Sequence, residues 1–324
     1  MCTAATYLTK DFYFGRNLDL HMSYNEGVTI TPRDFPFHFR CGKNLNQHYA
    51  IIGMATVVSD YPLYFDATNE KGLSLAGLNF PKNAVYYEKK ENKENITPFE
   101  LIPWILGQCA TVAEALCLLE KMNLWNDPFS QHLPLSPLHW MLADRERCVV
   151  LEPMADGLKI HENPIGILTN NPPFEYHMYH LADFMNATSR IPTNRFASQV
   201  DLIPYSLGMG SIGIPGDMSS ASRFVKAAFT KLNSISGNAE SESISQFFHI
   251  LGSVTQQRGL TAVEGEEYEF TLYSSCCNTD KGIYYYTTYE NSQITAVSMH
   301  NENLDQQTLI FYPLVKGQQI FFQN

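Results

Sequence analysis

Short hydrophobic runs separated by polar turns fill the first 80 residues of the chain and indicate β-strands. Residues 3–8 and 12–17 flank the polar sequence Thr9-Lys10-Asp11, a pattern typical of a β-hairpin. The segments 51–58 and 73–78 are apolar along most of their length, which predicts strands buried within a sheet. Residues 88–96 (EKKENKENI) are strongly charged and are expected to form a surface loop.

Two helix starts follow this strand-rich region. Thr97-Pro98-Phe99-Glu100 has the form of a capping box with proline at the first helical position, and it precedes the apolar sequence LIPWILGQC. Thr111-Val112-Ala113-Glu114 repeats the signal before ALCLLEKM, whose apolar residues have helical spacing. Three prolines in residues 126–139 then indicate a loop. Strands are predicted after it, at 139–143, 148–152 and 165–169.

The C-terminal half is predicted to contain two further helices and then a series of strands. Helical patterns cover 222–232 and 242–254. Strand patterns follow at 268–275, 282–289, 293–299 and 308–314. This order of strands, helices and strands again is typical of the α+β class, in which helices lie on antiparallel sheets. No composition break marks a boundary, so we expect one domain over residues 1–324.

Composition limits the partners of this chain. Its 33 acidic and 22 basic side chains give a formal net charge of -11, which argues against nucleic acid and anionic membrane as partners, since both attract basic faces. No apolar run approaches the roughly 20 residues that span a bilayer, and the first residues lack the basic and apolar regions of a secretion signal. The seven cysteines show no C-x-x-C spacing, which favours free thiols in a reducing cytoplasm over a disulfide scaffold.

A glycine-rich motif suggests a dinucleotide, but its surroundings argue against one. Residues 208–213 fit G-x-G-x-x-G, which needs a helix directly after it and an acidic residue about 20 positions on. Ile214-Pro215-Gly216-Asp217 interrupts this pattern, and residues 229–237 contain no acid, so a glycine-rich loop is the better interpretation. His177 and His180 share one helical face, but no third metal ligand is indicated nearby. We therefore expect neither a cofactor nor a metal.

Cys2 has the most distinctive chemistry in the sequence, because it follows the initiator methionine. Cysteine is small enough for that methionine to be removed after synthesis, which would place a free α-amino group on the same residue as a thiol. An α-amino group has a pKa of about 7.7 to 8.0, so near neutral pH it can accept the proton of the thiol. Cys2 is thus a candidate nucleophile with its own base attached, although taken alone an ordinary N-terminus is the commoner explanation.

Two charged residues are expected on or at the end of the strand beside Cys2. They are Arg16 and Asp19, in the sequence Phe14-Gly15-Arg16-Asn17-Leu18-Asp19. A guanidinium favours thiolate over thiol, and a carboxylate can hold an α-ammonium or orient an amine. A structural ion pair at a strand end would explain the same residues equally well.

Further motifs, in matching order, make the chain resemble the choloylglycine hydrolase family, which contains bile salt hydrolases and penicillin V acylases. The motifs are MCTA and YFGRNLDL near the start, NEKGLSLAGLNFP at 69–81, SPLHW at 136–140, LTNNP at 168–172, MGSIGIPGDMSSASRFVKA at 209–227 and YSSCCNTDKGIYYYTTY at 273–289. They span essentially the whole chain and include the glycine-rich segment as a family loop. The resemblance implies the N-terminal nucleophile hydrolase fold, a four-layer αββα sandwich of two antiparallel sheets between helical layers.

The same resemblance implies catalytic roles for six residues. Cys2 would be the nucleophile, its freed amine the base and later the acid, and Arg16 and Asp19 would hold the thiol and the amine. Asn79 and Asn170 would supply the oxyanion hole, where losing one fixed amide donor costs roughly 3 to 4 kcal/mol. Arg223 would be the remaining active-site arginine, and its place in a first helical turn, where the helix dipole disfavours a cation, hints at a role other than helix stability. Without the resemblance, both asparagines would be ordinary turn residues.

Position 79 favours one branch of the family. Penicillin V acylases of the family typically carry Tyr there, so Asn79 implies hydrolysis of glycine- or taurine-conjugated bile salts through a thioester. A steroid needs a broad apolar pocket beside Arg16 and Asn79. Candidate pocket residues on loops are Leu20, Met22, Phe65, Phe129 and Leu138, although simple packing would explain them as readily.

Three other interpretations stay open from the sequence. One is a penicillin V acylase or another N-acyl amide hydrolase of the same family, and a second is a non-catalytic acidic binding protein that retains the fold. A third, a papain-like enzyme, would need a histidine base. Family members are commonly tetramers, so the resemblance also implies a homo-oligomer.

Overall fold

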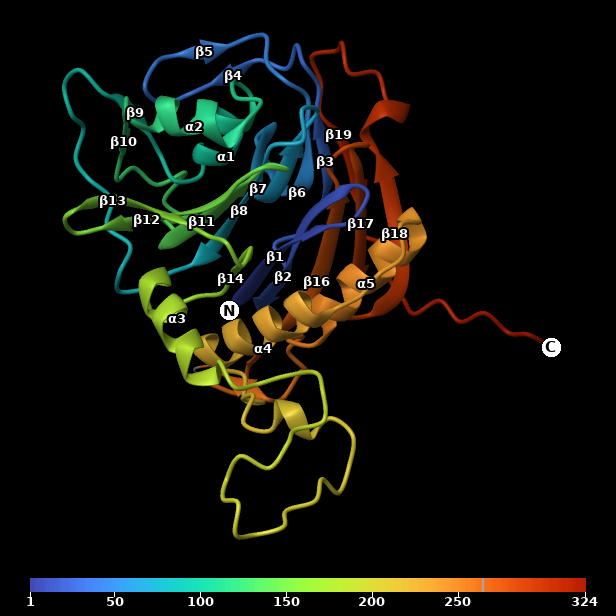
Figure 1. Cartoon of the computed structure of the whole chain (residues 1–324). Coiled ribbons are helices and arrows are strands. Elements are labelled where there is room, and N and C mark those ends of the chain that lie inside the picture. Colours follow the sequence, from blue (N-terminus) through green and yellow to red (C-terminus); the bar gives the residue numbers. More distant parts are fainter. Residues whose placement is uncertain (264) are drawn as a thin grey trace.

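The computed structural model describes residues 1–263 and 265–324 and contains two large antiparallel sheets (Figure 1). In the first, the seven-stranded sheet, the strand order is β14–β1–β2–β16–β17–β18, with β15 paired to β16. Its strands are β1 (Cys2–Leu8), β2 (Phe12–Leu20), β14 (Ile167–Leu168), β15 (Thr261–Ala262), β16 (Tyr268–Asn278), β17 (Ile283–Thr288) and β18 (Asn291–Ser298).

The eight-stranded sheet has the order β13–β12–β11–β8–β7–β6–β3–β19. Its strands are β3 (Gly27–Thr31), β6 (Ile51–Val58), β7 (Tyr61–Asn69), β8 (Ser74–Asn79), β11 (Leu138–Ala143), β12 (Cys148–Met154), β13 (Gly157–Glu162) and β19 (Ile310–Pro313). Two short pairs lie outside it, formed by β4 (Phe37–His38) with β5 (Asn44–Leu45) and by β9 (Glu94–Ile96) with β10 (Met122–Leu124).

Helices cover the outer face of each sheet, which confirms the predicted α+β class and its αββα layers. Helices α4 (Ser220–Asn233) and α5 (Glu240–Gly252) pack on the seven-stranded sheet, and α1 (Leu101–Leu106) and α2 (Val112–Leu119) pack on the other side of the molecule (Figure 1). A short helix, α3 (Phe174–His180), lies against α4.

Strand β6 shows why the hydrophobic runs are continuous. Ile52 and Met54 belong to the apolar core between the two sheets, whereas Ile51 and Ala55 belong to the core beneath α1 and α2. Because successive side chains of a strand point to opposite faces, a strand covered on both faces needs apolar residues at every position. The predicted strand over 51–58 is confirmed for this reason.

The predicted N-terminal hairpin is also confirmed, and its position in the sheet brings polar side chains into the interior. Strands β1 and β2 pair with Cys2 opposite Leu18 and Leu8 opposite Phe12. On its other side β2 pairs with β16 so closely that a Cβ on Gly15 would lie 2.0 Å from the Ser275 carbonyl oxygen. Every residue of β2 up to Asp19 is buried.

Other boundaries differ from the sequence prediction. Helix α1 begins at Leu101 rather than Pro98, because the Glu100 carboxylate accepts both the backbone N–H and the hydroxyl of Thr97 in a separate turn before the helix. Helix α2 begins as predicted, with the Thr111 hydroxyl capping Glu114. The predicted charged loop ends in the short strand β9, and the elements that were not predicted include β3, β7 and β13.

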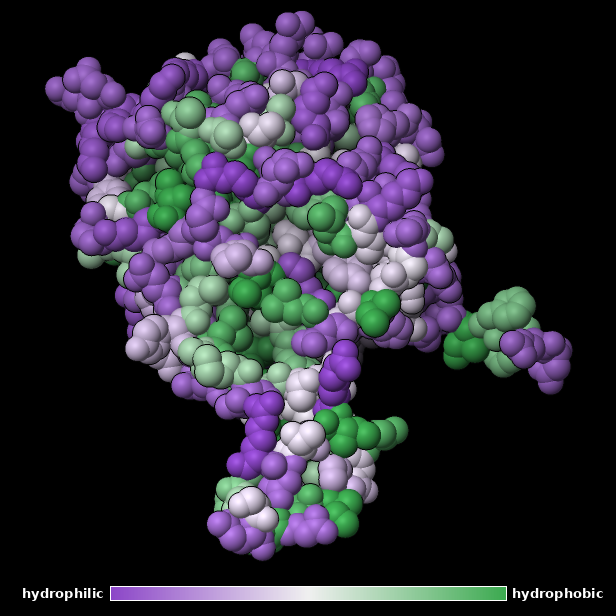
Figure 2. All heavy atoms as spheres, in the orientation of Figure 1, coloured by the Kyte–Doolittle hydropathy of each residue, from purple (hydrophilic) through white to green (hydrophobic). Residues whose placement is uncertain are grey.

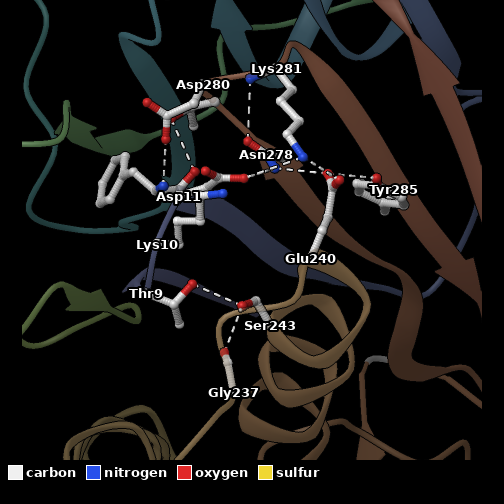
Figure 3. Close-up of polar contacts among 12 residues, drawn as sticks. Thr9, Lys10, Asp11, Gly237, Glu240, Ser243, Asn278, Asp280, Lys281 and Tyr285 are labelled. Carbon is white, nitrogen blue, oxygen red and sulfur yellow. Dashed lines mark hydrogen bonds and ion pairs between the residues drawn. The ribbon is translucent and has the colours of Figure 1, made fainter.

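A polar cluster fixes the start of α5 to the turns of the seven-stranded sheet (Figure 3). The Glu240 carboxylate accepts from Asn278 Nδ2 at 2.8 Å, Tyr285 Oη at 3.0 Å and Lys281 Nζ at 2.6 Å. Asn278 also donates to Asp11 in the β1–β2 turn at 2.9 Å. We call these five residues the α5 anchor; it ties one helix to two hairpin turns that are far apart in sequence.

The segment 185–213 projects from the body of the molecule (yellow in Figure 1). It exposes large apolar side chains, several of them visible as green atoms at the tip of the projection in Figure 2. They include Met185, Ile191, Phe196, Ile203, Tyr205 and Leu207. The glycine-rich sequence 208–213 lies at the end of this segment, as a loop with one short 3-10 turn, so the interpretation as a loop is confirmed. In the described ranges, no helix is both long enough and apolar enough to cross a bilayer.

Candidate functional site

Cys2 opens β1 in a buried position, with only 3% of its surface exposed. Its backbone N–H donates to Asn170 Oδ1 at 2.8 Å, and its carbonyl accepts from Arg223 Nη1 at 2.6 Å. The Met1 ammonium donates to the Asp19 carbonyl at 2.7 Å and pairs with Glu269 at 2.6 Å. While Met1 is attached, the α-nitrogen of Cys2 is an amide and cannot act as a base.

Arg16 lies fully buried in β2. Its Nη1 donates to the carbonyl oxygens of Phe65 at 3.0 Å and Gly77 at 2.5 Å, both in the eight-stranded sheet. Its Nη2 is buried and has no hydrogen-bond partner among the described residues. Burial disfavours the charged guanidinium, but the nearby Cys2, Tyr273, Asp66 and Asp19 groups together outweigh it and raise the pKa of Arg16 above its usual value. A cation held in this way favours the thiolate of Cys2.

Asp19 is likewise buried, at the end of β2 that lies beside Met1. Its Oδ1 accepts from the Thr271 hydroxyl at 2.6 Å, whereas Oδ2 is without a partner in the described part of the chain. Burial raises the pKa of Asp19, and the Arg223 guanidinium and the N-terminal ammonium oppose that shift. The uncommitted oxygen is therefore available to an ammonium at the N-terminus.

Asn170, in the turn after β14, brings the remaining polar groups together. Its Nδ2 donates to the Asn79 carbonyl at 2.7 Å, and its Oδ1 accepts from Arg223 Nη2 at 2.8 Å. Because a guanidinium only donates, this contact determines which end of the Asn170 amide is the oxygen and directs Nδ2 toward Asn79. The two asparagines therefore lie together beside Cys2.

Arg223 connects helix α4 to this cluster. It lies in the first turn of the helix, after the N-cap Ser219, and only 1% of its surface is exposed. Besides Cys2 and Asn170, its guanidinium donates to the Thr3 hydroxyl at 2.6 Å. Burial lowers the pKa of Arg223, against the opposing influence of Asp19. The structure thus gathers Cys2, Arg16, Asp19, Asn79, Asn170 and Arg223 into one buried site between the sheets and α4.

The candidate pocket residues do not all lie at this site. Leu20 follows Asp19 at the end of β2, the Phe65 carbonyl holds Arg16, and Leu138 pairs with Asn79 across β11 and β8. These three residues lie in strands, so their placement on loops was wrong. Met22 lies beyond the end of β2 and is 48% exposed.

Phe129 belongs to a separate aromatic group. Its ring centroid lies 5.9 Å from Tyr61 and 5.1 Å from Phe99, and its carbonyl accepts from Arg40 at 2.5 Å. Among the described residues, none of these aromatic or hydrogen-bond partners of Phe129 belongs to the cluster around Cys2.

The two histidines weighed as metal ligands have separate partners. His177 is buried in α3 and donates from Nε2 to the Asn170 carbonyl at 2.9 Å, whereas His180 contacts Asp183 at 3.0 Å. Among residues 1–263 and 265–324, no group of three or more His, Cys, Asp or Glu side chains is arranged to hold a metal ion.

Several supporting residues were not identified from the sequence. Asp66 carries a signal, because it is a charged residue within the strand sequence YPLYFDATN of β7. Two others carry no such signal in the sequence. The Thr271 hydroxyl donates to Asp19, and the Ser220 hydroxyl accepts from the Asn170 backbone N–H at 2.8 Å. Their importance depends on strand register and helix placement, which a single sequence does not specify.

Comparison with known proteins agrees with this geometry. Residues 2–312 match the family model described as linear amide C–N hydrolases, choloylglycine hydrolase family. The chain is 56% identical over 324 residues to a bile salt hydrolase/transferase of Lactiplantibacillus plantarum, with both chains covered completely. It is 38% identical over 311 residues to a bile salt hydrolase/transferase of Clostridium perfringens, with 94% of each chain covered.

Solved structures show the same architecture. The C2A mutant of conjugated bile acid hydrolase from Clostridium perfringens superposes with a TM-score of 0.92 at 36% identity, and each chain is covered completely. Penicillin V acylase from Agrobacterium tumefaciens shares the fold, with a TM-score of 0.75 at 18% identity over 97% of this chain and 92% of that one.

Proposed function

Because the chain belongs to the choloylglycine hydrolase family of linear amide C–N hydrolases, we propose that it hydrolyses the amide bond joining a bile acid to glycine or taurine. The observation that carries this proposal is the 56% identity, over the complete chain, to a bile salt hydrolase/transferase. The buried cluster around Cys2 supports it, since it combines a thiol with cations and amide donors.

Activation begins with removal of Met1, which frees the α-amino group of Cys2. This amine accepts the thiol proton, and Arg16 stabilises the resulting thiolate through its unpartnered Nη2. Asp19 holds the protonated amine through its unpartnered Oδ2. The ion pair between Met1 and Glu269 is lost in the processed enzyme.

The thiolate then attacks the amide carbonyl, and a C–S bond forms while the carbonyl electron pair moves to oxygen. Amide N–H groups of Asn170 and Asn79 donate to this oxyanion. The Cys2 ammonium protonates the departing nitrogen, the C–N bond breaks, and the amino acid leaves a thioester. Water, deprotonated by the amine, attacks the thioester and releases the free bile acid and the thiol. An amine in place of water would give transfer, an activity that the names of both of these relatives include.

The apolar part of the substrate is proposed to lie along Leu20, Met22, Phe65 and Leu138, near Arg16 and Asn79. Leu20 and Leu138 support this placement because each lies next to, or pairs with, a residue of the cluster. Phe129 packs against Tyr61 and Phe99 and is proposed to lie at the outer edge of the pocket.

We further propose that the enzyme acts as a homotetramer in the cytoplasm of a bacterium, in lipid and steroid metabolism. The exposed apolar side chains of segment 185–213 support self-association, since monomers rarely expose large contiguous apolar patches. The seven cysteines are free thiols, which supports a reducing compartment.

Replacement of Cys2 tests the mechanism. Cys2→Ala is expected to fold with an unchanged unfolding temperature and to release no glycine from glycocholate. Cys2→Ser should retain less than about 1% of kcat, because a hydroxyl is much harder to deprotonate than a thiol. Substantial hydrolysis by Cys2→Ala would contradict the nucleophile assignment.

Substrate choice is tested by comparing kcat/KM for glycocholate, taurocholate and penicillin V. The wild-type enzyme, with Met1 removal verified by intact mass, is expected to prefer both bile salts. A preference for penicillin V would show that the acylase alternative is correct, and no hydrolysis of any substrate would favour a non-catalytic binding protein.

A further inference from the structure

We propose that His139 and Glu152 are positioning residues that hold the two halves of the oxyanion hole in one arrangement. His139 lies on β11 and Glu152 on the neighbouring strand β12, and their exposed fractions are 0% and 1%. The inference rests on the oxyanion role proposed above for Asn79 and Asn170.

His139 is bonded through both ring nitrogens. Its Nε2 lies 2.9 Å from the Thr169 carbonyl oxygen, and because a carbonyl only accepts, Nε2 carries a proton. Its Nδ1 lies 3.1 Å from Glu152 Oε1, within hydrogen-bond distance, which fixes the ring orientation. The Thr169 carbonyl belongs to the same peptide group as the Asn170 N–H, so the His139 bond fixes the peptide plane that precedes Asn170.

The same ring contacts the strand that carries the other asparagine. Phe80, directly after Asn79, stacks on His139 with ring centroids 4.3 Å apart and an interplanar angle of 5°. The Phe80 backbone N–H donates to the Pro137 carbonyl at 2.7 Å. One imidazole therefore contacts a residue adjacent to each proposed oxyanion donor, Thr169 through its carbonyl and Phe80 through its ring.

A second histidine fixes the peptide on the other side of Asn170. His177 Nε2 donates to the Asn170 carbonyl, and its ring stacks on Phe224 at 4.7 Å. His177 lies in α3, whose first N–H, that of Phe174, donates to Glu152 Oε1 at 3.0 Å. Glu152 thus orients His139 directly and His177 through the start of α3.

Other charged groups face this network. Arg223, His139 and Glu152 lie close enough to His177 to influence its pKa. His161 Nε2 lies 3.6 Å from Glu152 Oε2. His161 in turn lies 3.7 Å from the exposed Glu175.

Since an error of about 1 Å in the position of a catalytic group can cost roughly 100-fold in rate, a network of this kind would act on kcat rather than on substrate affinity.

Two isosteric replacements at position 139 separate the two bonds of the ring. The amide nitrogen of glutamine approximates Nε2, whereas that of asparagine approximates Nδ1. His139→Gln should therefore keep the Thr169 bond and retain kcat for glycocholate within about fivefold. His139→Asn should lose that bond and lower kcat by about 30- to 100-fold, with KM within about threefold. The alkylation rate of Cys2 by iodoacetamide, followed on the N-terminal peptide by mass spectrometry, should match wild type in both variants.

His48→Asn is the matched control, because His48 is also buried and bonds two carbonyls, those of Phe35 at 2.9 Å and Tyr49 at 2.7 Å. It should lower the unfolding temperature without changing kcat. If His139→Asn does not fold, the same comparison is made at position 177. His177→Gln should keep kcat within about threefold of wild type, and His177→Leu should lower it at least tenfold. Equal kcat values for the two variants at the tested position, with an active wild type, would overturn the positioning role. A wild type that does not hydrolyse glycocholate would contradict the proposed function itself.

Discussion

Asp66 shows at the residue scale how a buried arginine can keep part of its guanidinium free. The Asp66 carboxylate is 2% exposed and accepts from the hydroxyls of Tyr273 and Tyr284, each at 2.7 Å, and of Ser275 at 3.2 Å. Burial raises the pKa of Asp66, and the Arg16 guanidinium is the largest influence that opposes the shift. Because three hydroxyls hold the carboxylate at a distance, it balances the charge of Arg16 without occupying Nη2.

His177 makes stability depend on pH at the same scale. Burial lowers the pKa of His177 to about 4, while the unfolded value is about 6.5. The unfolded chain therefore binds this proton more readily, so the contribution is present above pH 6.5 and is lost as the pH falls toward 4. From pH 7 to pH 5, the wild-type free energy of unfolding should fall about 2 kcal/mol more than that of His177→Gln, measured by urea unfolding. A fall of equal size in both proteins would contradict the assignment of a neutral buried histidine.

The α5 anchor shows at the element scale how side chains fix a helix on a sheet. Glu240, the first residue of α5, accepts hydrogen bonds from three residues of the β16–β17 hairpin (Figure 3). Glu240→Ala should lower the free energy of unfolding by roughly 1 to 2 kcal/mol at pH 7, since charged hydrogen bonds are lost at a partly exposed position. Urea unfolding measures this loss, and Glu91→Ala, in the charged loop, removes the same charge as a control. Equal effects of the two variants would show that the anchor adds nothing to stability.

The sequence predicted individual helices and strands better than it predicted which of them lie side by side. The 51–58 strand and the Thr111 cap follow from local spacing, and the structure contains both. Thr97 had an equally good local signal, but its hydroxyl donates to Glu100 in a turn before the helix, so the start of α1 was misplaced. The motifs indicated the residues proposed as catalytic. The proposed support from His139 depends on β11 lying beside β12 and near the Asn170 turn, which no local pattern encodes.

At the scale of the whole molecule, net charge is a weak guide to the substrate. A chain with a formal net charge of -11 would repel an anionic conjugate at long range, but the interaction is screened beyond a Debye length of about 8 Å in physiological salt. Arg16 and Arg223 are buried at the site itself, where screening is weaker. We therefore expect the local cations, rather than the acidic surface, to govern how an anionic substrate would bind at this site.

The projecting segment 185–213 is a candidate surface for self-association. Phe196, Tyr205 and Leu207 are 85%, 83% and 83% exposed, which water disfavours unless a second copy of the chain covers them. Wild-type protein should therefore behave as a tetramer in sedimentation equilibrium, and the double variant Phe196→Ser with Tyr205→Ser should shift to smaller species. Ile235→Ser is the matched control, because Ile235 is 90% exposed but lies between α4 and α5, outside the segment. It should leave the mass unchanged. If the double variant keeps the wild-type mass, the interface lies elsewhere, and the aromatic-rich C-terminal strands become the surface to test.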